Sequence, residues 1–394
     1  MTELYDPFCH ELHEDPYPVY RVLRDEHPLY WCEARRCWAL TRFDDVWEAV
    51  HDPTTYCSGK GIFPGMGGDV AQEEMLPVLI VMDPPRHTQL RSLVNKAFSP
   101  RRILDREPAI RSVAHALVAE LADRETVDVV EDLAKPLPSI VIADLLGVPV
   151  ADRREFRHWS DQIVQDHPDD PAAAAAAMEG LAGLYSYFEG LIAERRRHPR
   201  HDMLSALIEA EIDGHHLGEQ ELLGMCILLL IAGNETTTNL VSNAVLLLAQ
   251  HPAERRRLLD DPSLVVSATE ECLRFDSPVQ ALARTLTTDV DLHGTTVPAG
   301  DRILLVYGSA NRDEREFPGP DTFDVGRRVE RQLAFGHGIH FCLGSALARL
   351  EGRLALSELL ALSPEWELDG EPVRLHSGPI RGLLRLPVSL RPAA

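Results

Sequence analysis

The stretch that decides the fold is Phe335-Gly336-His337-Gly338-Ile339-His340-Phe341-Cys342-Leu343-Gly344. It encloses one cysteine among three glycines, two histidines and two phenylalanines, directly before an Ala-, Leu- and Arg-rich run, Ser345 to Leu356, that predicts a helix. Glycines at this density permit close backbone approaches that other residues forbid. A thiolate at the start of a helix also faces backbone N–H groups and the positive end of the helix dipole. The segment therefore predicts an anionic sulfur presented to a metal centre.

Two other interpretations of Cys342 start from the same residues. A free cysteine is most often a small buried hydrophobic residue. The spacing His337-x-x-His340-x-Cys342 would also suit a zinc cluster. Zinc sites usually need a fourth ligand and favour C-x2-C pairs, however, and the chain contains no C-x-x-C.

The whole ten-residue string resembles the haem-binding loop of the cytochrome P450 family, F-G-x-G-x-H/R-x-C-x-G, without a gap. This resemblance implies a mainly α protein with a small β portion: one cytochrome P450 domain over residues 1–394, with a long central helix over a buried haem b. It also implies that Cys342 is the axial thiolate on the haem iron, the ligand that favours O–O cleavage.

The pattern of segments along the chain is in keeping with that fold class. Asp15-Pro16-Tyr17-Pro18 opens a predicted helix to about Asp25, and strand-like runs follow at Leu29–Trp31 and Cys37–Thr41. A glycine-rich segment, 56–82, suggests a mobile lid or pocket wall. Helical periodicity dominates from Thr88 to Leu273, strand and turn character from Val290 to Tyr307, and the last thirty residues look strand-like.

Composition excludes several classes of protein. The net charge of −23 argues against a nucleic-acid partner. Seven irregularly spaced cysteines suggest reduced thiols. The acidic start of the chain, Met1 to Asp6, suggests neither a signal peptide nor a membrane anchor, and the longest apolar stretch, Leu222 to Gly233, is too short to cross a bilayer. We expect a soluble, cytoplasmic monomer.

The segment Glu219 to Gln250 is the best candidate for the central helix. At about 1.5 Å per residue it would span roughly 45 Å. It is apolar nearly all round, so it should be buried. Its middle holds Ala232-Gly233-Asn234-Glu235-Thr236-Thr237, whose polar groups cost stability in an apolar core. A structural kink is one interpretation, because threonine hydroxyls can bond the carbonyl one turn back.

The resemblance supplies a second interpretation of this segment, since it matches the family's A/G-G-x-D/E-T motif on the distal side of the haem. Gly233 would leave room for dioxygen. Thr236 would hydrogen-bond the reacting oxygen or its water, and Glu235 would take part in proton delivery, which is general acid catalysis through a hydroxyl and water. We therefore expect Thr236, Glu235 and Cys342 to be the catalytic residues.

A third motif, Glu271-Cys272-Leu273-Arg274, means little alone, because Glu/Arg pairs three residues apart are common on solvated helices. Its position about seventy residues before Cys342 matches the family's E-x-x-R. The resemblance implies that this pair is buried and that Arg327, from Phe323-Asp324-Val325-Gly326-Arg327, joins it in a structural role.

Haem carries two propionates, which need cationic partners when partly buried. The segment from Asp83 to Arg91 offers a helix start, with Asp83 as a candidate cap. His87 and Arg91 lie four residues apart on one helix face. The resemblance implies that both bind the propionates, and that Arg284 and His340 complete these cofactor contacts.

The residues around the substrate are the least determined. Alignment on the Thr236 motif and the apolar character of the later segments give the candidates Leu228, Ile231, Ala232, Val279, Ala281, Leu282 and Ile380. Their apolarity suggests a hydrophobic small molecule. Steroid, terpenoid, macrolide, fatty-acid and aromatic substrates all stay open.

The sequence shows no flavin or iron–sulfur domain, so we expect the electrons to come from other proteins. Five arginines from Arg327 to Arg353, opposed only by Glu330 and Glu351, suggest a basic face for an acidic ferredoxin, with Arg101 and Arg102 nearby. Ordinary solvated arginines are the alternative. The resemblance thus implies a monooxygenase that uses O2 and electrons from NAD(P)H, relayed by ferredoxin reductase and ferredoxin. A peroxide-driven enzyme and a haem sensor are the rival functions, and the Glu235-Thr236 pair argues against both.

Overall fold

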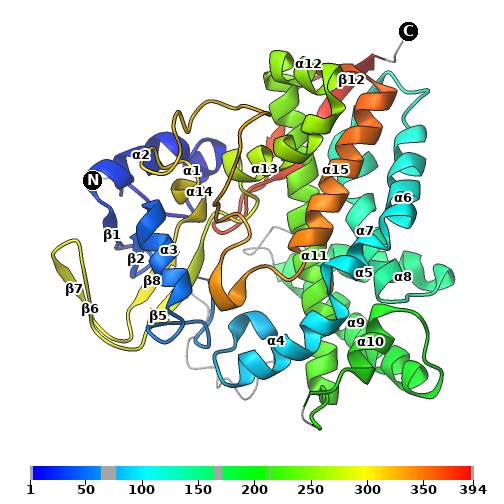
Figure 1. Ribbon diagram of the computed structural model, residues 1–394, viewed down its shortest axis with the longest axis horizontal. Helices are drawn as coiled ribbons and strands as arrows, with labels where there is room; N and C mark the ends of the chain where they lie inside the picture. Colours follow the sequence, from blue (N-terminus) through cyan, green and yellow to red (C-terminus); the bar gives the residue numbers. More distant parts are fainter. Residues whose placement is uncertain (1–2, 64–76, 164–170, 213, 392–394) are drawn as a thin grey trace.

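The fold is described from a computed structural model, which covers residues 3–63, 77–163, 171–212 and 214–391. Helices predominate, as predicted (Figure 1). The α-helices are α1 His10–Glu14, α2 Tyr17–Glu26, α3 Phe43–His51, α4 Arg86–Ala97, α5 Pro100–Leu104, α6 Glu107–Ala119, α7 Pro136–Leu145, α8 Arg153–Ile163, α9 Pro171–Arg197, α10 Met203–Glu209, α11 Glu219–Gln250, α12 Pro252–Asp260, α13 Val265–Phe275, α14 Tyr307–Ala310 and α15 Ser345–Leu362. Shorter 3-10 or π segments are η2 Leu79–Val81, η3 Val130–Ala134, η4 Val150–Asp152, η5 Pro262–Leu264 and η6 Gly338–His340.

The strands are short and gather mainly in one part of the molecule. They are β1 Leu29–Cys32, β2 Cys37–Leu40, β3 Tyr56–Cys57, β4 Thr126–Asp128, β5 Leu282–Leu286, β6 Val290–Leu292, β7 Thr295–Val297, β8 Arg302–Leu305, β9 Glu365–Leu368, β10 Val373–Arg374, β11 Leu383–Arg385 and β12 Pro387–Arg391. The strands predicted near residues 29, 37, 290–307 and the end of the chain are therefore confirmed.

The central helix α11 has the bounds that the sequence predicts, Glu219–Gln250. Its first turn carries Glu219 and Glu221, whose negative charges favour a helix N-terminus. The Glu221 carboxylate also accepts the backbone N–H of Gly218 at 2.8 Å, which satisfies a donor at the helix start. Helix α11 stays helical through residues 232–237, so the polar segment in its middle does not break it.

The helical part is built around α11, against which α7, α9, α13 and α15 pack. Helix α15 lies between α6 and α11 (Figure 1). Its approach to α11 is close at Gly352, where an added Cβ would come within 3.0 Å of the Leu240 side chain. The largest cluster of buried apolar residues fills the space between these helices.

The β-rich part is a five-stranded sheet in the order β1-β2-β8-β5-β3, covered by α1, α2, α3 and α14 (Figure 1). Strands β1 and β2 form an antiparallel hairpin, and β2 pairs in parallel with β8, Trp38 opposite Ile303. A separate three-stranded sheet, β4-β12-β9, lies beside the helices. The buried faces of the larger sheet form two further apolar clusters.

The segment before α4 differs in part from the expectations of the sequence. Asp83 does not cap α4, which is preceded by Pro85 without a side-chain cap. Its carboxylate instead accepts the backbone N–H groups of Ser58 and Gly59, each at 2.8 Å. About half of the predicted lid, residues 64–76 of the 56–82 segment, lies outside the described residues. No helix in the described part of the chain is long and apolar enough to cross a membrane.

Candidate active site

The loop around Cys342 is folded by glycines and by a return of the chain onto itself. The backbone N–H of Cys342 donates to the carbonyl oxygen of Phe335 at 2.9 Å. Gly336 and Gly338 have φ values of 60° and 68°, which side chains other than glycine rarely adopt. A Cβ on Gly338 would also overlap the carbonyl oxygen of Val50 at the end of α3. The loop can therefore lie against α3 only with glycine at position 338.

Opposing effects act on the pKa of the Cys342 thiol. Burial raises the pKa of this thiol. Backbone N–H groups of Gly344 and Ser345, at the start of α15, and the positive charges of Arg91 and Arg349 oppose that shift. These donors and charges are those that stabilise a thiolate. A cation bound to the sulfur would add to them and tip the balance towards the anion.

The zinc interpretation is not supported. His337 turns towards α3, where its Nδ1 lies 2.7 Å from His51 Nε2 and its ring lies 4.3 Å from that of Trp47. His340 turns towards α4 and packs against the ring of His87, with 4.3 Å between centroids. The two histidines thus diverge. Within the residues that the structure covers, no group of three or more His, Cys, Asp or Glu could hold a metal ion.

One face of α11 differs from the rest of this buried helix. Around its middle, residues spaced by one and two helical turns are partly or fully accessible. They are Leu228, Ile231, Ala232, Glu235 and Thr236. Asn234, on another face, is buried and receives a hydrogen bond from Ser139 at 3.0 Å. Accessible side chains in the middle of a central helix show that it borders an internal hollow, and we call these five residues the accessible face of α11.

The polar residues of this face sit on intact helix. The Thr236 hydroxyl donates to the carbonyl oxygen of Ala232 at 2.7 Å, the bond one turn back that the sequence suggests. The Thr236 hydroxyl oxygen can still accept a hydrogen bond from a group in the hollow. At Gly233 an added Cβ would meet only Ile142, at an ordinary 3.7 Å. The neighbouring Ile142 would therefore tolerate a side chain at position 233, and its distance does not explain why this residue is glycine.

Four basic residues far apart in sequence converge beside the cysteine loop. Burial, together with the charges of Arg284, His87 and Arg91, lowers the pKa of His340 to about 3. Both ring nitrogens of His87 and the Nε2 of His340 are buried without a hydrogen-bond partner. Arg91 donates to the carbonyl oxygen of Phe341 at 2.5 Å. Among the described residues, none of the four forms a salt bridge with a carboxylate.

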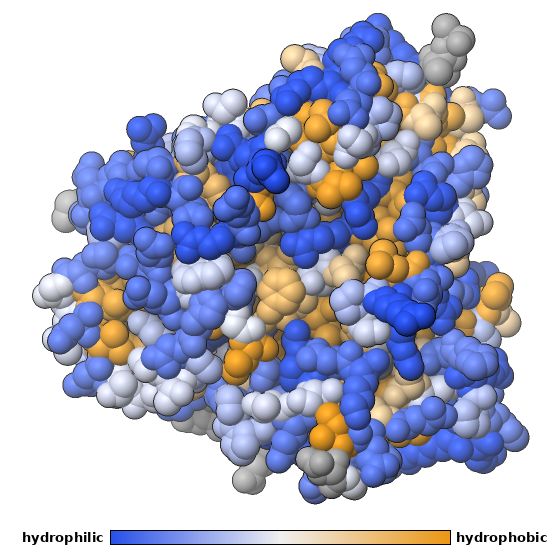
Figure 2. Space-filling model, viewed as in Figure 1, coloured by the Kyte–Doolittle hydropathy of each residue, from blue (hydrophilic) through white to orange (hydrophobic). Residues whose placement is uncertain are grey.

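These observations fit the haem that the resemblance implies. Orphaned buried nitrogens and uncompensated positive charge are costly, and two propionates would satisfy both. The sulfur of Cys342 and the accessible face of α11 are the two remaining features that a haem needs, an axial ligand and an open distal side. Figure 2 shows apolar side chains gathered in the middle of one face of the molecule, between the β-rich part and the helices.

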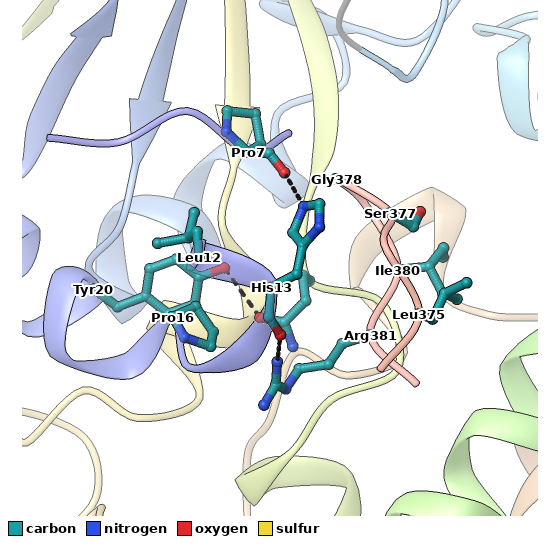
Figure 3. A pocket seen from close by; sticks show the side chains of 11 residues that line it. Pro7, Leu12, His13, Pro16, Tyr20, Leu375, Ser377, Gly378, Ile380 and Arg381 are labelled. Atoms are coloured by element: carbon teal, nitrogen blue, oxygen red, sulfur yellow. Dashed lines mark hydrogen bonds between the residues drawn. The ribbon is translucent and has the colours of Figure 1, made fainter. Parts of the chain in front are cut away.

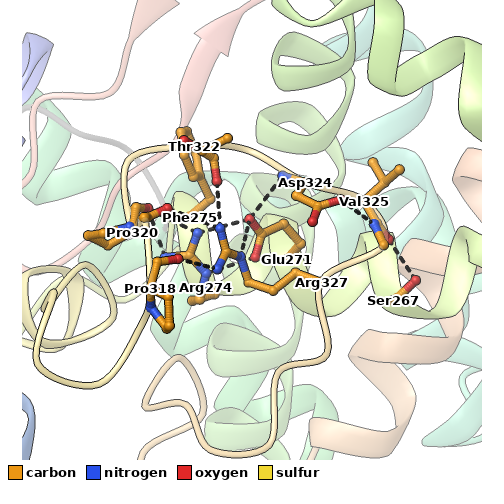
Figure 4. A network of polar contacts seen from close by, with 12 residues as sticks. Ser267, Glu271, Arg274, Phe275, Pro318, Pro320, Thr322, Asp324, Val325 and Arg327 are labelled. Atoms are coloured by element: carbon orange, nitrogen blue, oxygen red, sulfur yellow. Dashed lines mark hydrogen bonds and ion pairs between the residues drawn. The ribbon is translucent and has the colours of Figure 1, made fainter.

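The predicted Glu/Arg cluster is present and buried (Figure 4). Arg274 binds the Glu271 carboxylate through Nε at 2.7 Å and Nη2 at 2.9 Å, and neither side chain is exposed. Arg327 Nε donates to the same carboxylate at 3.1 Å. Both arginines also bind backbone carbonyls between residues 311 and 322. The cluster thus fastens the chain segment before the cysteine loop to α13.

The other substrate-pocket candidates divide into two groups. Val279 and Ile380 form an isolated antiparallel bridge, so these two distant segments meet. Leu282 is half-buried on β5. Ala281 is different, because it is 1% exposed and belongs to the apolar cluster under α1 and α2. Ala281 is therefore packed away from Leu282, because alternation along an extended segment turns neighbouring side chains to opposite faces.

A buried cluster that sequence analysis missed holds the turn that carries Ile380. Asp276, at the end of α13, accepts from Tyr17 Oη and Arg381 Nε, each at 2.5 Å, and pairs with Arg374 at 3.5 Å. Burial alone would raise the pKa of Asp276, but these partners lower it to about 2. Asn243 on α11 donates to the Arg381 carbonyl oxygen at 3.1 Å. Only the partners from three distant segments, α2, α11 and the 374–381 turn, reveal this aspartate.

The same turn also borders a small pocket on the side of the N-terminal helices (Figure 3). Arg381 Nη1 donates to the carbonyl oxygen of His13 at 2.5 Å, and Tyr20 Oη donates to Gln280 at 3.1 Å. These polar side chains are thus engaged in hydrogen bonds within the protein, which leaves the pocket an apolar niche beside Ile380.

Comparison with known proteins gives the class of this protein. A family model described as "Cytochrome P450" matches residues 184–269 and 263–373. The vitamin D(3) 25-hydroxylase of Pseudonocardia autotrophica is 42% identical over 398 residues, covering 99% of this chain and 98% of that protein. The chain therefore belongs to the cytochrome P450 family. It is a cytochrome P450 monooxygenase, and its cofactor is haem.

Solved structures agree with this assignment. The structure of CYP109Q5 from Chondromyces apiculatus has a TM-score of 0.91 and 38% identity, and covers 99% of this chain and 98% of that chain. The structure of CYP109E1 from Bacillus megaterium in complex with testosterone has a TM-score of 0.88 and 38% identity, and covers 96% of this chain and 99% of that chain. The predicted fold class is thereby confirmed.

Proposed function

We propose that this enzyme inserts one oxygen atom from O2 into a hydrophobic small molecule, most simply as a hydroxylation, with electrons from NAD(P)H relayed by ferredoxin reductase and ferredoxin. The observation that carries the proposal is the accessible face of α11, because it combines apolar side chains with an acid and a hydroxyl. When bound, a thiolate-ligated haem supplies the oxygen activation. The chain's own residues must then bind the cofactor, exclude water and move protons.

We assign the residues as follows. Cys342 is the axial ligand, held by its backbone bond to Phe335 and by the helix start behind it. The four basic residues bind the propionates, which would pair the orphaned nitrogens of His87 and His340. Leu228, Ile231 and Ala232 line the hollow with apolar surface, which excludes water and orients an apolar substrate.

Thr236 and Glu235 are assigned to proton delivery. The Thr236 hydroxyl already donates its proton to the Ala232 carbonyl oxygen. The hydroxyl oxygen can therefore accept a hydrogen bond from a donor in the hollow. Glu235, on the same accessible face, is a carboxylic acid within the same turn of helix. A relay through these two groups holds a proton near the reacting atoms without opening the site to bulk water.

The experiment for Thr236 is Thr236→Ala, measured as product formed per NAD(P)H consumed. We expect the ratio to fall, with electrons diverted to peroxide or water, because the hydroxyl that holds the proton is gone. Thr238→Ala is the matched control, since its hydroxyl donates to Ala134 at 3.1 Å on a buried face of the same helix. Equal coupling in wild type and Thr236→Ala would remove Thr236 from the mechanism.

The Cys342 assignment is tested by spectroscopy. The reduced carbon monoxide complex should show the strongly red-shifted Soret band of thiolate ligation. An imidazole-like band would instead exclude Cys342 as the ligand.

Vitamin D3 and testosterone, named for two relatives, are both largely hydrocarbon. We propose a substrate of the same apolar kind, which suits the half-buried apolar side chains of Val279, Leu282 and Ile380. A spectral binding screen that starts with steroids, followed by product analysis, tests this. If only charged, water-soluble compounds shift the haem spectrum, the substrate class is wrong.

The ferredoxin proposal rests on only part of the basic surface that the sequence suggests. Several arginines of the 327–353 stretch are engaged in ion pairs, with partners Glu271, Glu316 and Glu270. Arg101 and Arg102, however, are exposed on α5, which packs against α15. Their reversal to glutamate should slow reduction by an acidic ferredoxin. Rapid peroxide-supported turnover, with none when ferredoxin and reductase are supplied, would favour a peroxide-driven enzyme instead.

A further inference from the structure

A pair of cysteines outside the active site lies at the end of the β1–β2 hairpin. Cys32 closes β1 and Cys37 opens β2, and the two are direct partners in the antiparallel register. Directly opposed residues have Cα atoms about 4.5 Å or about 5.5 Å apart, depending on the type of pair. Both separations fall within the range that a disulfide bridges, about 4.4–6.8 Å. Opposed side chains also project from the same face of the sheet.

The surroundings of the pair favour reaction between the two thiols. Cys32 and Cys37 are 0% and 2% exposed, and both are free thiols. The hydrogen bond that Cys32 donates to Cys37 lowers the pKa of Cys37, while the same bond raises the pKa of Cys32. The charges of Arg302 and Arg35 also lower the pKa of Cys37. Cys37 is therefore the better nucleophile of the two.

A short N-terminal segment covers the pair. Glu3 accepts the backbone N–H groups of Glu33 at 2.5 Å and Ala34 at 3.3 Å in the hairpin turn. Asp6 binds Arg35 through two hydrogen bonds of 2.7 and 2.9 Å. Tyr5, between these two anchors, is 1% exposed. Both anchors lie at the surface, and an exposed ion pair such as that of Asp6 with Arg35 breaks readily. Opening of residues 3–6 would expose the thiols without unfolding the sheet.

We propose that Cys32 and Cys37 form a redox-sensitive site, a cross-strand disulfide made by exchange with a low-molecular-weight disulfide when the N-terminal cover opens. The Cys37 thiolate attacks one sulfur of the reagent and releases one thiolate, giving a mixed disulfide on Cys37. Cys32, after losing its proton to solvent, attacks the Cys37 sulfur and releases the second thiol. The protein loses two protons and two electrons, and the reagent is reduced to two thiols.

The test treats the full-length, haem-loaded protein with oxidised glutathione, blocks the remaining thiols, and maps peptides by mass spectrometry without reduction. We expect one cross-linked peptide pair, Cys32 with Cys37. Cys37→Ser should abolish all reaction at the hairpin. Cys32→Ser should instead stop at a stable glutathione adduct on Cys37. Cys226→Ser, which removes a buried cysteine of α11, should leave the cross-link unchanged.

The role of the cover is tested by rate. Asp6→Asn removes one anchor and should speed cross-linking about two- to fivefold, the range for loss of one exposed ion pair. Asp25→Asn removes an exposed pair with Arg315 elsewhere and should leave the rate unchanged. Absence of a Cys32–Cys37 cross-link in both the wild type and Asp6→Asn, or preferential modification of another cysteine, would overturn the proposal.

Discussion

The buried carboxylate of Glu271 gives the most direct test of how the fold is held together. It accepts two bonds from Arg274, one from Arg327 and one from the backbone N–H of Asp324 at 3.1 Å. Glu271→Gln keeps the size of the side chain but replaces one acceptor oxygen by a donor amide. The amide would face guanidinium groups, and the charge of Arg274, with 0% of its side chain exposed, would lose its counter-ion. Breaking such a buried pair costs about 3–5 kcal/mol.

The neighbouring residue offers a matched control. Glu270 lies on the same helix and binds Arg349 at 2.6 Å, but the two side chains are 23% and 29% exposed. Glu270→Gln should therefore cost only about 0–1 kcal/mol. Both variants, loaded with haem, would be unfolded in urea and the free energies extrapolated to water. A loss for Glu271→Gln no larger than that for Glu270→Gln would refute the view that this cluster secures the segment before the cysteine loop.

Two further predictions concern buried acids. Asp276→Asn should lower the free energy of unfolding by about 2 kcal/mol at neutral pH, at about 1.4 kcal/mol per pKa unit. The pKa of Asp276 in the folded protein is about 2, which is below its unfolded value. In urea titrations, the advantage of the wild type should therefore be present above about pH 4 and vanish as the pH falls to about 2. Burial raises the pKa of Glu351 to about 8. The neutral form of this side chain therefore contributes fully to the stability of the fold below about pH 4.5, and this contribution is lost as the pH rises through 8. Glu351→Gln should therefore gain stability over wild type, up to about 4 kcal/mol, between about pH 5 and pH 8; a gap that does not change with pH would show that Glu351 is ionised throughout.

Local patterns predicted most of what depends on local physics. The apolar run and acidic first turn of α11 fixed its bounds, and the glycines of the cysteine loop indicated a backbone that the φ values of Gly336 and Gly338 confirm. Contacts between distant segments were harder to foresee. The sequence places Glu351 between Arg349 and Arg353, a pattern that predicts a surface charge within a basic face. In the structure, Glu351 lies on a buried face of α15 and is 2% exposed.

The failures at Asp83 and Ala281 have the same origin. A sequence shows that an aspartate precedes a helix, but not that a separate turn at Ser58 and Gly59 competes for its carboxylate. Likewise, Val279, Ala281 and Leu282 are all apolar, and only the packing of the sheet decides which of these side chains enter which apolar cluster. The Asp276 cluster joins α2, α13 and the 374–381 turn, and no spacing within the chain signals it.

The parallel pairing of β2 with β8 has a consequence for how the protein is made. Residues 38–40 find their partners only at residues 303–305, so a ribosome must synthesise most of the chain before the central strands of this sheet can meet. Pairings of such high sequence separation form slowly, because a long loop must close first. During that interval the β1–β2 hairpin would have an open edge and an uncovered apolar face, the kind of surface that chaperones bind. The topology thus leaves the N-terminal fifth of the chain open to aggregation until β8 has been synthesised.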